Sequence, residues 1–256
     1  MVNEKMLADN GTLKGWQVDG IDVIYPERKV VIDGIEKLRG GAPVCCPIFG
    51  KMPETPDYEG LDLPQHGLVR LGDRHVYKLH TSLNRNEMIL SNFSGIDSYL
   101  MAHYEYYRVV YEKPWEHTIT ILLKTLRTHP YLEHDIRVLS TPVGNQKRMP
   151  ASIALHPYFS TMGEEFTIVY GRQTILSGDI QEGVSRQIEA TMPIINLAHG
   201  QVVISTHVSS YTGFNIWTDD IKKYICVEPY YGIGGIHYLP SFQPLICRCQ
   251  ISFKQK

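Results

Sequence analysis

The chain has no long apolar run. A membrane-spanning helix needs about 18 unbroken apolar residues, and no segment approaches that length. Residues 1–15 carry acidic and polar side chains where a signal peptide would need an apolar stretch. Charge of either sign is also not in excess, because the formal net charge is -2, and no broad field attracts nucleic acid or an anionic membrane. These absences predict a soluble, cytoplasmic protein without nucleic-acid or membrane partners.

The five cysteines are too few and too irregularly spaced for a disulfide framework or a paired CxxC metal site. Cys45 and Cys46 are adjacent, and Cys226, Cys247 and Cys249 lie inside strand-like runs. Buried free thiols are the better interpretation, which agrees with a reducing compartment.

The sequence also lacks a Ser/Gly-rich linker, a run of like charges, a fixed-period repeat and a low-complexity tract. A length of 256 residues would allow one large β domain or two small ones. Because nothing marks a boundary, we expect a single domain over residues 1–256. An apolar content of 43% suits a compact core.

Short runs rich in Val, Ile, Tyr, Thr and Phe recur along the chain, separated by Gly, Pro, Asn and Asp. Examples are DVIYP, HVYKLHT, EYYRVVYE, HTITILLKTL, DIRVLST, ASIALHPYF, FTIVYG, QVVISTHV, FNIWT, YICVE and LICRCQISFK. The pattern predicts an all-β sandwich, or a closed or stacked antiparallel sheet. Only residues 92–107 could be read as a helix, although Gly95 and the aromatic residues disfavour it.

Two short turns present basic side chains. In LRGGAPVCCPIFGK, Gly40 and Gly41 allow a sharp turn beside Arg39; in LPQHGLVR, a glycine follows His66 and Arg70 comes shortly after. Guanidinium and imidazole groups suit a phosphate site or a polyhydroxylated ligand. Each motif alone is also compatible with an ordinary loop.

A titratable residue ends each of two apolar runs and is followed at once by proline. ASIALHPYFS runs into His156, and YICVEPYYG runs into Glu228. Proline favours extended geometry in the residue before it and ends regular pairing, so we expect both side chains at the mouth of a pocket. A carboxylate and an imidazole placed this way are a candidate general base and general acid.

The stretch HPYLEHD carries metal-ligand residue types at His129, Glu133, His134 and Asp135. Its spacing matches no zinc pattern, and Pro130 interrupts any helix that would align them. We therefore expect a solvated loop here and no metal site.

Taken together, RGGAPVCCPIFG, LPQHGLVR, ALHPYF and CVEPY, in this order, resemble the aldose 1-epimerase (galactose mutarotase-like) superfamily. The nearest branch is the hexose-6-phosphate 1-epimerases. The resemblance runs from residue 16 to the final strand-like run and implies a large antiparallel β-sandwich, sometimes called a supersandwich. It also implies interconversion of the α and β anomers of an aldohexose or its 6-phosphate, without a cofactor.

Carried over to this chain, the resemblance implies that Glu228 removes the proton of the C1 hydroxyl while His156 protonates the ring oxygen. A pyranose ring would then lie between the two side chains, which should not be in direct contact.

The resemblance also implies a set of substrate-binding residues. Arg39 and His66 would orient sugar oxygens, Arg70 would lie near a phosphate, and Asp179 is the nearest candidate for an acidic sugar contact. With a phosphorylated substrate, Arg39 and Arg70 should converge on one anion. Lys51 and Arg74 are nearby in sequence and could add charge, and Tyr158, Trp217, Tyr230 and Tyr231 could stack on a sugar or pack in the core.

Two other functions remain open at this point. The chain could be a non-catalytic sugar-binding β-sandwich that keeps the pocket. A lyase or hydrolase on a similar fold would need a second carboxylate opposite Glu228. The choice between free sugar and sugar phosphate, and the oligomeric state, also stay open.

Overall fold

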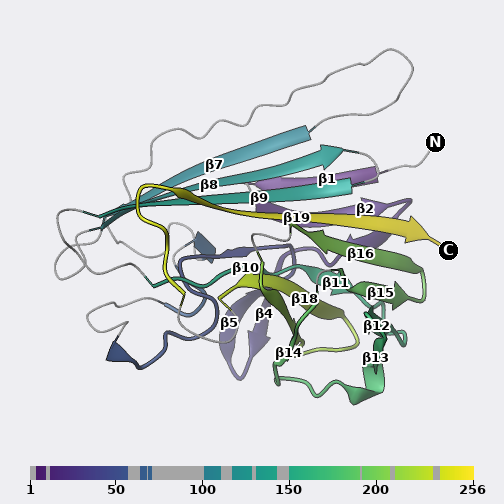
Figure 1. Cartoon of the computed structure of the whole chain (residues 1–256). Coiled ribbons are helices and arrows are strands. Elements are labelled where there is room, and N and C mark those ends of the chain that lie inside the picture. Colours follow the sequence, from purple (N-terminus) through teal and green to yellow (C-terminus); the bar gives the residue numbers. More distant parts are fainter. Residues whose placement is uncertain are drawn as a thin grey trace, which may run out of the picture.

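The computed structural model describes residues 4–9, 12–56, 64–67, 69–70, 101–110, 117–128, 131–142, 150–190, 192–207, 211–232 and 237–256 (Figure 1). These residues contain two large antiparallel sheets, one two-stranded hairpin and no α-helix. The all-β sandwich predicted from the sequence is thus confirmed. Among the same residues, no helix is long and apolar enough to cross a membrane.

The first sheet has nine strands. In spatial order they are β1 (Glu4–Asp9), β2 (Thr12–Val18), β3 (Ile21–Ile24), β11 (Tyr158–Ser160), β18 (Tyr224–Tyr231), β10 (Ile153–Leu155) and β6 (Val44–Cys45), with β17 (Gly213–Trp217) and β14 (Arg186–Ile188) branching from β18. Strand β18 is the centre of this sheet, because it pairs with β17 along one edge and with both β10 and β11 along the other.

The second sheet has eight strands. Their order is β13 (Gln173–Leu176), β12 (Thr167–Tyr170), β15 (Ile194–Leu197), β16 (Gly200–Thr206), β19 (Pro244–Gln255), β9 (Tyr131–Pro142), β8 (His117–Thr128) and β7 (Met101–Val110). A short 3-10 turn, η3 (Ser177–Asp179), follows β13. The remaining strands, β4 (Arg28–Ile32) and β5 (Ile35–Arg39), form a separate hairpin. Figure 1 shows β7, β8, β9 and β19 in one layer, with β10, β11 and β18 below it.

The main core lies between the sheets and follows the two-residue period of the strands. Strand β16 alternates buried and half-buried residues, as expected when one face is covered. Strand β18 is instead buried almost throughout, which shows that both its faces are covered. Ile225 and Val227 point into the main core, whereas Tyr224 and Cys226 belong to a second cluster. This second face of the nine-stranded sheet carries the site described below.

One local expectation is wrong, and the disfavoured helical alternative is excluded over the part of its range that the structure describes. The helix considered for residues 92–107 is excluded over residues 101–107, which lie in β7; residues 92–100 are outside the described part. The stretch with Glu133, His134 and Asp135 is not a solvated loop, because it lies in β9, which pairs with β8 on one edge and β19 on the other. His134 and Asp135 are buried there, and Arg137 and Arg248 pair with the Asp135 carboxylate.

The five cysteines are all buried and free, as predicted. Three of them, Cys46, Cys247 and Cys249, pack in the main core. Cys45 and Cys226 lie in the smaller clusters on the second face of the nine-stranded sheet.

Three glycines allow the motif loops to pass close to other backbone. A Cβ at Gly40 would lie 2.3 Å from the carbonyl oxygen of Pro26, and one at Gly67 would lie 2.3 Å from the carbonyl oxygen of Cys46. A Cβ at Gly41 would lie 2.5 Å from the carbonyl oxygen of Leu13. All three have positive φ, a region that residues with a Cβ rarely adopt. The glycine pair beside Arg39 and the glycine after His66 are thus needed for the turns predicted from the sequence.

We expect Gly67→Ala to destabilise the protein more than Gly50→Ala. Both glycines have positive φ, so each alanine carries a conformational cost of about 1–2 kcal/mol. Only at Gly67 does the new Cβ meet backbone, since nothing lies within 4 Å of the Cβ position at Gly50. The clash should add about 1–3 kcal/mol to the loss in free energy of unfolding, measured by urea denaturation. Equal losses would show that the close approach at Gly67 is not tight.

Candidate active site

Strand register places His156 opposite Glu228. Strands β10 and β11 pair with β18 in the same register, with Ala154 opposite Tyr230 and Tyr158 opposite Cys226. Continuing that register across the gap between β10 and β11 brings His156 opposite Glu228. On the other side of β18, Asn215 of β17 is the register partner of Glu228.

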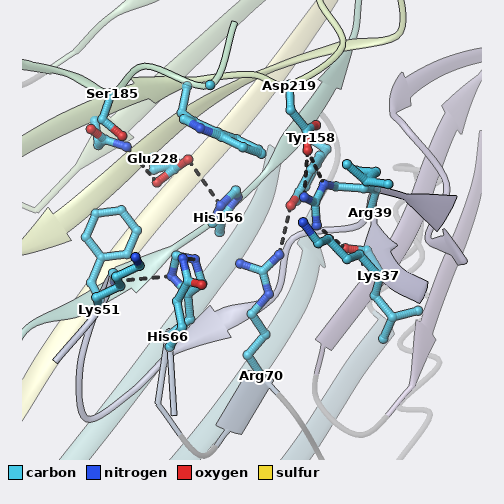
Figure 2. Close-up of a pocket in the computed structure, with 18 of the residues that line it drawn as sticks. Lys37, Arg39, Lys51, His66, Arg70, His156, Tyr158, Ser185, Asp219 and Glu228 are labelled. Carbon is cyan, nitrogen blue, oxygen red and sulfur yellow. Dashed lines mark hydrogen bonds and ion pairs between the residues drawn. The ribbon is translucent and has the colours of Figure 1, made fainter. Parts of the chain in front are cut away.

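These residues form the floor of a cavity of about 870 Å³ (Figure 2). The β4–β5 hairpin contributes part of the cavity wall. Its lining comprises Ile32, Glu36, Lys37, Leu38, Arg39, Phe49, Gly50, Lys51, Pro64, Gln65, His66, Arg70, His156, Tyr158, Gly183, Ser185, Gln187, Asn215, Trp217, Asp219 and Glu228. Of the six site residues predicted from the sequence, five therefore line one cavity.

The side chains of His156 and Glu228 are in direct contact, with 3.3 Å between Nε2 and Oε1. The expectation that a sugar ring separates them is therefore wrong. Their opposed register positions on neighbouring strands are the reason, because such pairs lie side by side. Asn215 donates a hydrogen bond of 3.1 Å to the other carboxyl oxygen, Oε2. Glu228 Oε1 and His156 Nδ1 are buried and make no hydrogen bond in the described structure.

The two proline motifs act differently. Pro157 separates β10 from β11, so His156 lies in a true break between strands, where its amide donates to the carbonyl oxygen of Pro43. Pro229, in contrast, lies inside β18 and is paired in register with Phe214. The expectation that pairing ends at Pro229 is wrong. Along one edge β17 continues the pairing, while on the other edge the pairs of β10 with β18 stop at Ala154 and Tyr230, so the missing amide of Pro229 interrupts no pair there.

Burial drives both members of the pair toward their neutral forms. Burial raises the pKa of Glu228 to about 8, against the smaller opposite effects of the Asn215 hydrogen bond and the Arg70 charge. Burial also holds the pKa of His156 well below its usual value, and the charge of Arg70 lowers it further. Near pH 7 the pair therefore holds one proton, on the carboxyl group.

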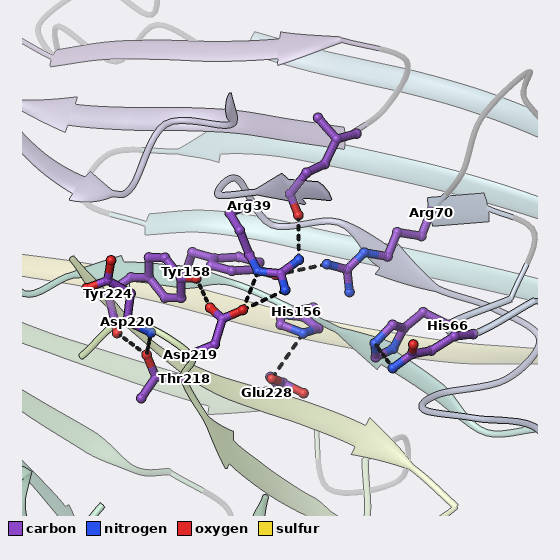
Figure 3. Close-up of polar contacts among 12 residues, drawn as sticks. Arg39, His66, Arg70, His156, Tyr158, Thr218, Asp219, Asp220, Tyr224 and Glu228 are labelled. Atoms are coloured by element: carbon purple, nitrogen blue, oxygen red, sulfur yellow. Dashed lines mark hydrogen bonds and ion pairs between the residues drawn. The ribbon is translucent and has the colours of Figure 1, made fainter. Parts of the chain in front are cut away.

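Arg39 is held by a carboxylate that the sequence analysis did not single out (Figure 3). Its Nε and Nη2 atoms donate to Oδ2 of Asp219 at 2.9 and 2.6 Å, and its guanidinium lies 5.4 Å from the ring centroid of Trp217. The hydroxyl of Tyr224 donates to the other oxygen of Asp219. Although Asp219 is half-buried, the hydrogen bonds from Arg39 and Tyr224 outweigh desolvation and lower its pKa. Arg39 therefore lines the cavity with its positive charge neutralised by Asp219.

The guanidinium of Arg70 uses fewer of its donors than that of Arg39. Its Nη2 donates to the hydroxyl of Tyr158 at 2.8 Å, and its Nη1 is buried without a partner. The ring of Tyr158 stacks on that of His156, with centroids 4.8 Å apart and an angle of 13° between the planes. Arg70 thus carries a donor that a ligand oxygen can accept. Arg39 and Arg70 contact different partners, so the described structure does not show them converging on one anion site.

His66 is positioned by a strained loop. Its φ of 67° is in the left-handed region, and Gly67 follows with 74°. The amide of Gly50 donates to His66 Nδ1 at 3.2 Å, and the ring lies 5.5 Å from that of His156. Burial and the charge of Arg70 lower the pKa of His66 to about 3, so the ring is neutral at pH 7. With Nδ1 accepting, the neutral ring presents its Nε2 proton as a donor.

Asp179 does not belong to the site. It lies in η3, is exposed and accepts a hydrogen bond from the amide of Leu176. It is absent from the cavity lining, so the proposed acidic sugar contact is not at this position. The aspartate of the lining is Asp219, just after β17, beside the glutamates Glu36 and Glu228.

Sequence reasoning missed Asn215 and Asp219. The available signal was the same one that identified His156 and Glu228, a polar residue within or directly after an apolar run, here FNIWTDD. Lys51, noted only as a nearby charge, lines the cavity together with Lys37. Arg74 and the run HVYKLHT lie outside the described residues.

No protein-family model and no curated protein matches the chain. Solved structures do match it over nearly its whole length. A galactose mutarotase-like protein from Lactobacillus casei is 14% identical, with a TM-score of 0.67 and coverage of 99% of both chains. The chain has the galactose mutarotase-like fold.

Two further structures support the same fold. A protein from Salmonella typhimurium, provisionally named a mutarotase, is 16% identical, with a TM-score of 0.60 and coverage of 96% of this chain and 85% of its own. One from Escherichia coli K12, provisionally named an aldose 1-epimerase, is 10% identical, with a TM-score of 0.60 and full coverage of both chains. At these identities the likeness concerns the fold alone.

We expect the raised pKa of Glu228 to appear as a loss of stability with rising pH. Between pH 7 and 8 the folded state still binds the carboxyl proton, whereas the unfolded chain, with an ordinary value of 4.5, has lost it. Unfolding then releases a proton, so higher pH favours unfolding. The slope from this residue approaches about 1.4 kcal/mol per pH unit.

The measurement is the free energy of unfolding at pH 7 and pH 8. Glu228→Gln should flatten the decline, because glutamine carries no proton to lose. Glu165→Gln, at an exposed position, serves as the matched control and should keep the wild-type slope. Parallel slopes in all three proteins would mean that Glu228 is ionised in the folded state.

Proposed function

We propose that the chain is an aldose 1-epimerase, which interconverts the α and β anomers of an aldohexose or of its 6-phosphate. The observation that carries this proposal is the buried Glu228–His156 pair at the floor of an open polar cavity. The mutarotase-like fold supports it, because three fold neighbours are named a galactose mutarotase-like protein and, provisionally, a mutarotase and an aldose 1-epimerase. The reaction needs one acid and one base and no cofactor.

The direct contact between the pair is compatible with this chemistry. The two oxygens that exchange protons, the C1 hydroxyl and the ring oxygen, are bonded to the same carbon. An acid and a base that lie side by side can therefore reach both oxygens from one side of the sugar, and the ring need not lie between them. The unpartnered atoms Glu228 Oε1 and His156 Nδ1 indicate that the pair has bonding capacity left for a ligand.

The proton shared by Glu228 and His156 is enough for the reaction, because the pair gives one proton to the sugar and takes one from it. Transfer of the proton from Glu228 to His156 gives a carboxylate and an imidazolium. The carboxylate then takes the C1 hydroxyl proton while the imidazolium protonates the ring oxygen, and the C1–ring oxygen bond breaks to give the open aldehyde. After this step Glu228 again holds the proton. Rotation about C1–C2 followed by the reverse steps closes the ring with the opposite configuration.

The remaining cavity residues suit a polyhydroxylated ligand. His66 Nε2 lies at the cavity 3.4 Å from the side-chain amide of Gln65, and Arg70 Nη1 has no hydrogen-bond partner. Trp217 presents a ring beside His156, with centroids 5.9 Å apart. Aromatic faces pack against the apolar face of a sugar ring. Asn215 fixes the carboxyl group of Glu228 by its hydrogen bond to Oε2.

The charge of the cavity supports a substrate with an anionic group. Each carboxyl group of the lining is already balanced, because Asp219 binds Arg39, Glu36 pairs with Lys29 and Glu228 holds a proton. Among the described residues, this leaves Lys37, Lys51 and Arg70 as cations of the lining without a paired carboxylate. A sugar phosphate would neutralise them, and guanidinium–phosphate contacts are charge-assisted.

We expect Glu228→Gln to slow anomer exchange by about 10²-fold or more, because the amide keeps the shape of the side chain but cannot accept the proton. The measurement is NMR exchange between anomers of glucose, galactose and glucose 6-phosphate. Sugar binding, followed by calorimetry, should survive the substitution. Binding without exchange in the wild-type protein would instead identify a sugar-binding protein.

We expect Arg70→Ala to weaken use of glucose 6-phosphate about ten- to a hundredfold more than use of free glucose, compared by kcat/KM. The reason is the loss of a charge-assisted contact of about 1.5–3 kcal/mol. Lys223→Ala, which removes an exposed cation outside the cavity lining, is the matched control. Equal losses for the two sugars would mean that Arg70 contacts the sugar ring or supports Tyr158, and the free sugar would be the better substrate assignment.

A further inference from the structure

A third potential metal ligand lies beside the Glu228–His156 pair. Cys226 precedes Glu228 by two positions in β18, so both side chains point to the same face of the sheet. His156 enters from the neighbouring edge, opposite Glu228. One ligand atom from each of His156, Cys226 and Glu228 lies within 4.8 Å of the others, and all three side chains are buried.

We propose that these three side chains form a binding site for a thiophilic divalent cation of the Zn²⁺ class, at the floor of the cavity. Imidazole nitrogen, thiolate sulfur and carboxylate oxygen are the donors that Zn²⁺ takes in proteins. A site with three protein ligands and an open fourth position is the arrangement of zinc centres that accept an exogenous ligand. Here His156 and Glu228 line the cavity, so a fourth ligand would reach the ion from that side, while Cys226 is buried outside the lining.

An unsatisfied carboxyl oxygen points to a ligand at this place. Glu228 Oε1 is buried and makes no hydrogen bond, and its printed contact is the 3.3 Å approach of His156 Nε2. Buried polar groups are rarely left unsatisfied, so this oxygen indicates a missing bonding partner. A cation bound between Oε1 and Nε2 would satisfy both atoms.

The geometry requires only a small adjustment. Two atoms bound to one Zn²⁺ at about 2.0–2.3 Å and at tetrahedral angles lie about 3.5 Å apart. Nε2 of His156 and Oε1 of Glu228 are already 3.3 Å apart. Cys226 lies next to them, between its register partners Tyr158 and Trp217, so the sulfur has to approach by about 1 Å.

The charges also balance. The entering cation displaces the carboxyl proton of Glu228 and the thiol proton of Cys226, so two positive charges leave as two arrive. Arg70 and Arg39 lie on the other side of His156 and oppose any further gain of positive charge. The ion and its three ligands together thus carry no net charge, so the net charge of the cavity does not change when the ion binds.

The metal site goes beyond the proposed anomer exchange and does not rest on it. Its consequence for that reaction would be competition, because the cation and the sugar need the same two side chains. The two ideas fail separately, since metal binding is read spectroscopically and requires no turnover.

The test uses Co²⁺ as the probe, added to the full-length protein without sugar. A thiolate ligand gives an intense sulfur-to-cobalt charge-transfer band, and Zn²⁺ should displace the probe and abolish it. Cys226→Ser should remove the band and weaken Co²⁺ binding about ten-fold or more, because loss of a direct ligand costs at least as much as loss of a supporting contact. Cys249→Ser, a buried thiol in the other sheet, is the matched control and should keep the band.

A second measurement avoids any loss of folding in the variant. X-ray absorption at the zinc edge of the wild-type protein with one equivalent of Zn²⁺ should show one sulfur at about 2.3 Å and nitrogen or oxygen neighbours at about 2.0–2.2 Å. A coordination shell without sulfur, or a Co²⁺ band that survives Cys226→Ser, would overturn the site.

Discussion

The site depends on one constraint, which is that strand β18 is buried on both faces. Its odd-numbered residues, such as Ile225 and Val227, fill the core between the two sheets. Its even-numbered residues point to the second face, where one of them, Glu228, places a carboxyl group in a buried position. A buried carboxyl group needs partners, and the neighbouring strands supply Asn215 on one edge and His156 on the other. The chemistry of the cavity follows from satisfying that one group.

The same constraint explains the electrostatics. Removing Glu228 and His156 from water disfavours the charged forms of both, so the pair keeps one proton that can move between them. Outside the pair, Arg39 is neutralised by Asp219, while Arg70 remains available through Nη1. The cavity therefore combines an uncharged, proton-carrying floor with a cationic wall.

The backbone of the loops keeps this arrangement in place. Gly40, Gly41 and Gly67 allow close contacts with Pro26, Leu13 and Cys46 that no other residue would permit. These contacts attach the Arg39 and His66 loops to the edge of the nine-stranded sheet, and the amide of Gly50 holds the ring of His66. Two of the cavity-lining side chains, Arg39 and His66, are thus presented by short loops on a sheet.

The sequence by itself determined the all-β class and most of the site. Alternating and continuous apolar runs predict strands because side chains alternate between faces, and His156, Glu228, Arg39, His66 and Arg70 stand out because glycine or proline frames them. Only the tertiary structure decided how these groups meet. The 3.3 Å contact of Glu228 with His156 comes from the register of β10 and β11 on β18, which no local pattern encodes. The presence of Asp219, and not Asp179, in the cavity wall likewise follows from which strands become neighbours. The burial of His134 in β9 has the same cause, because packing over the whole chain decides which strands pair.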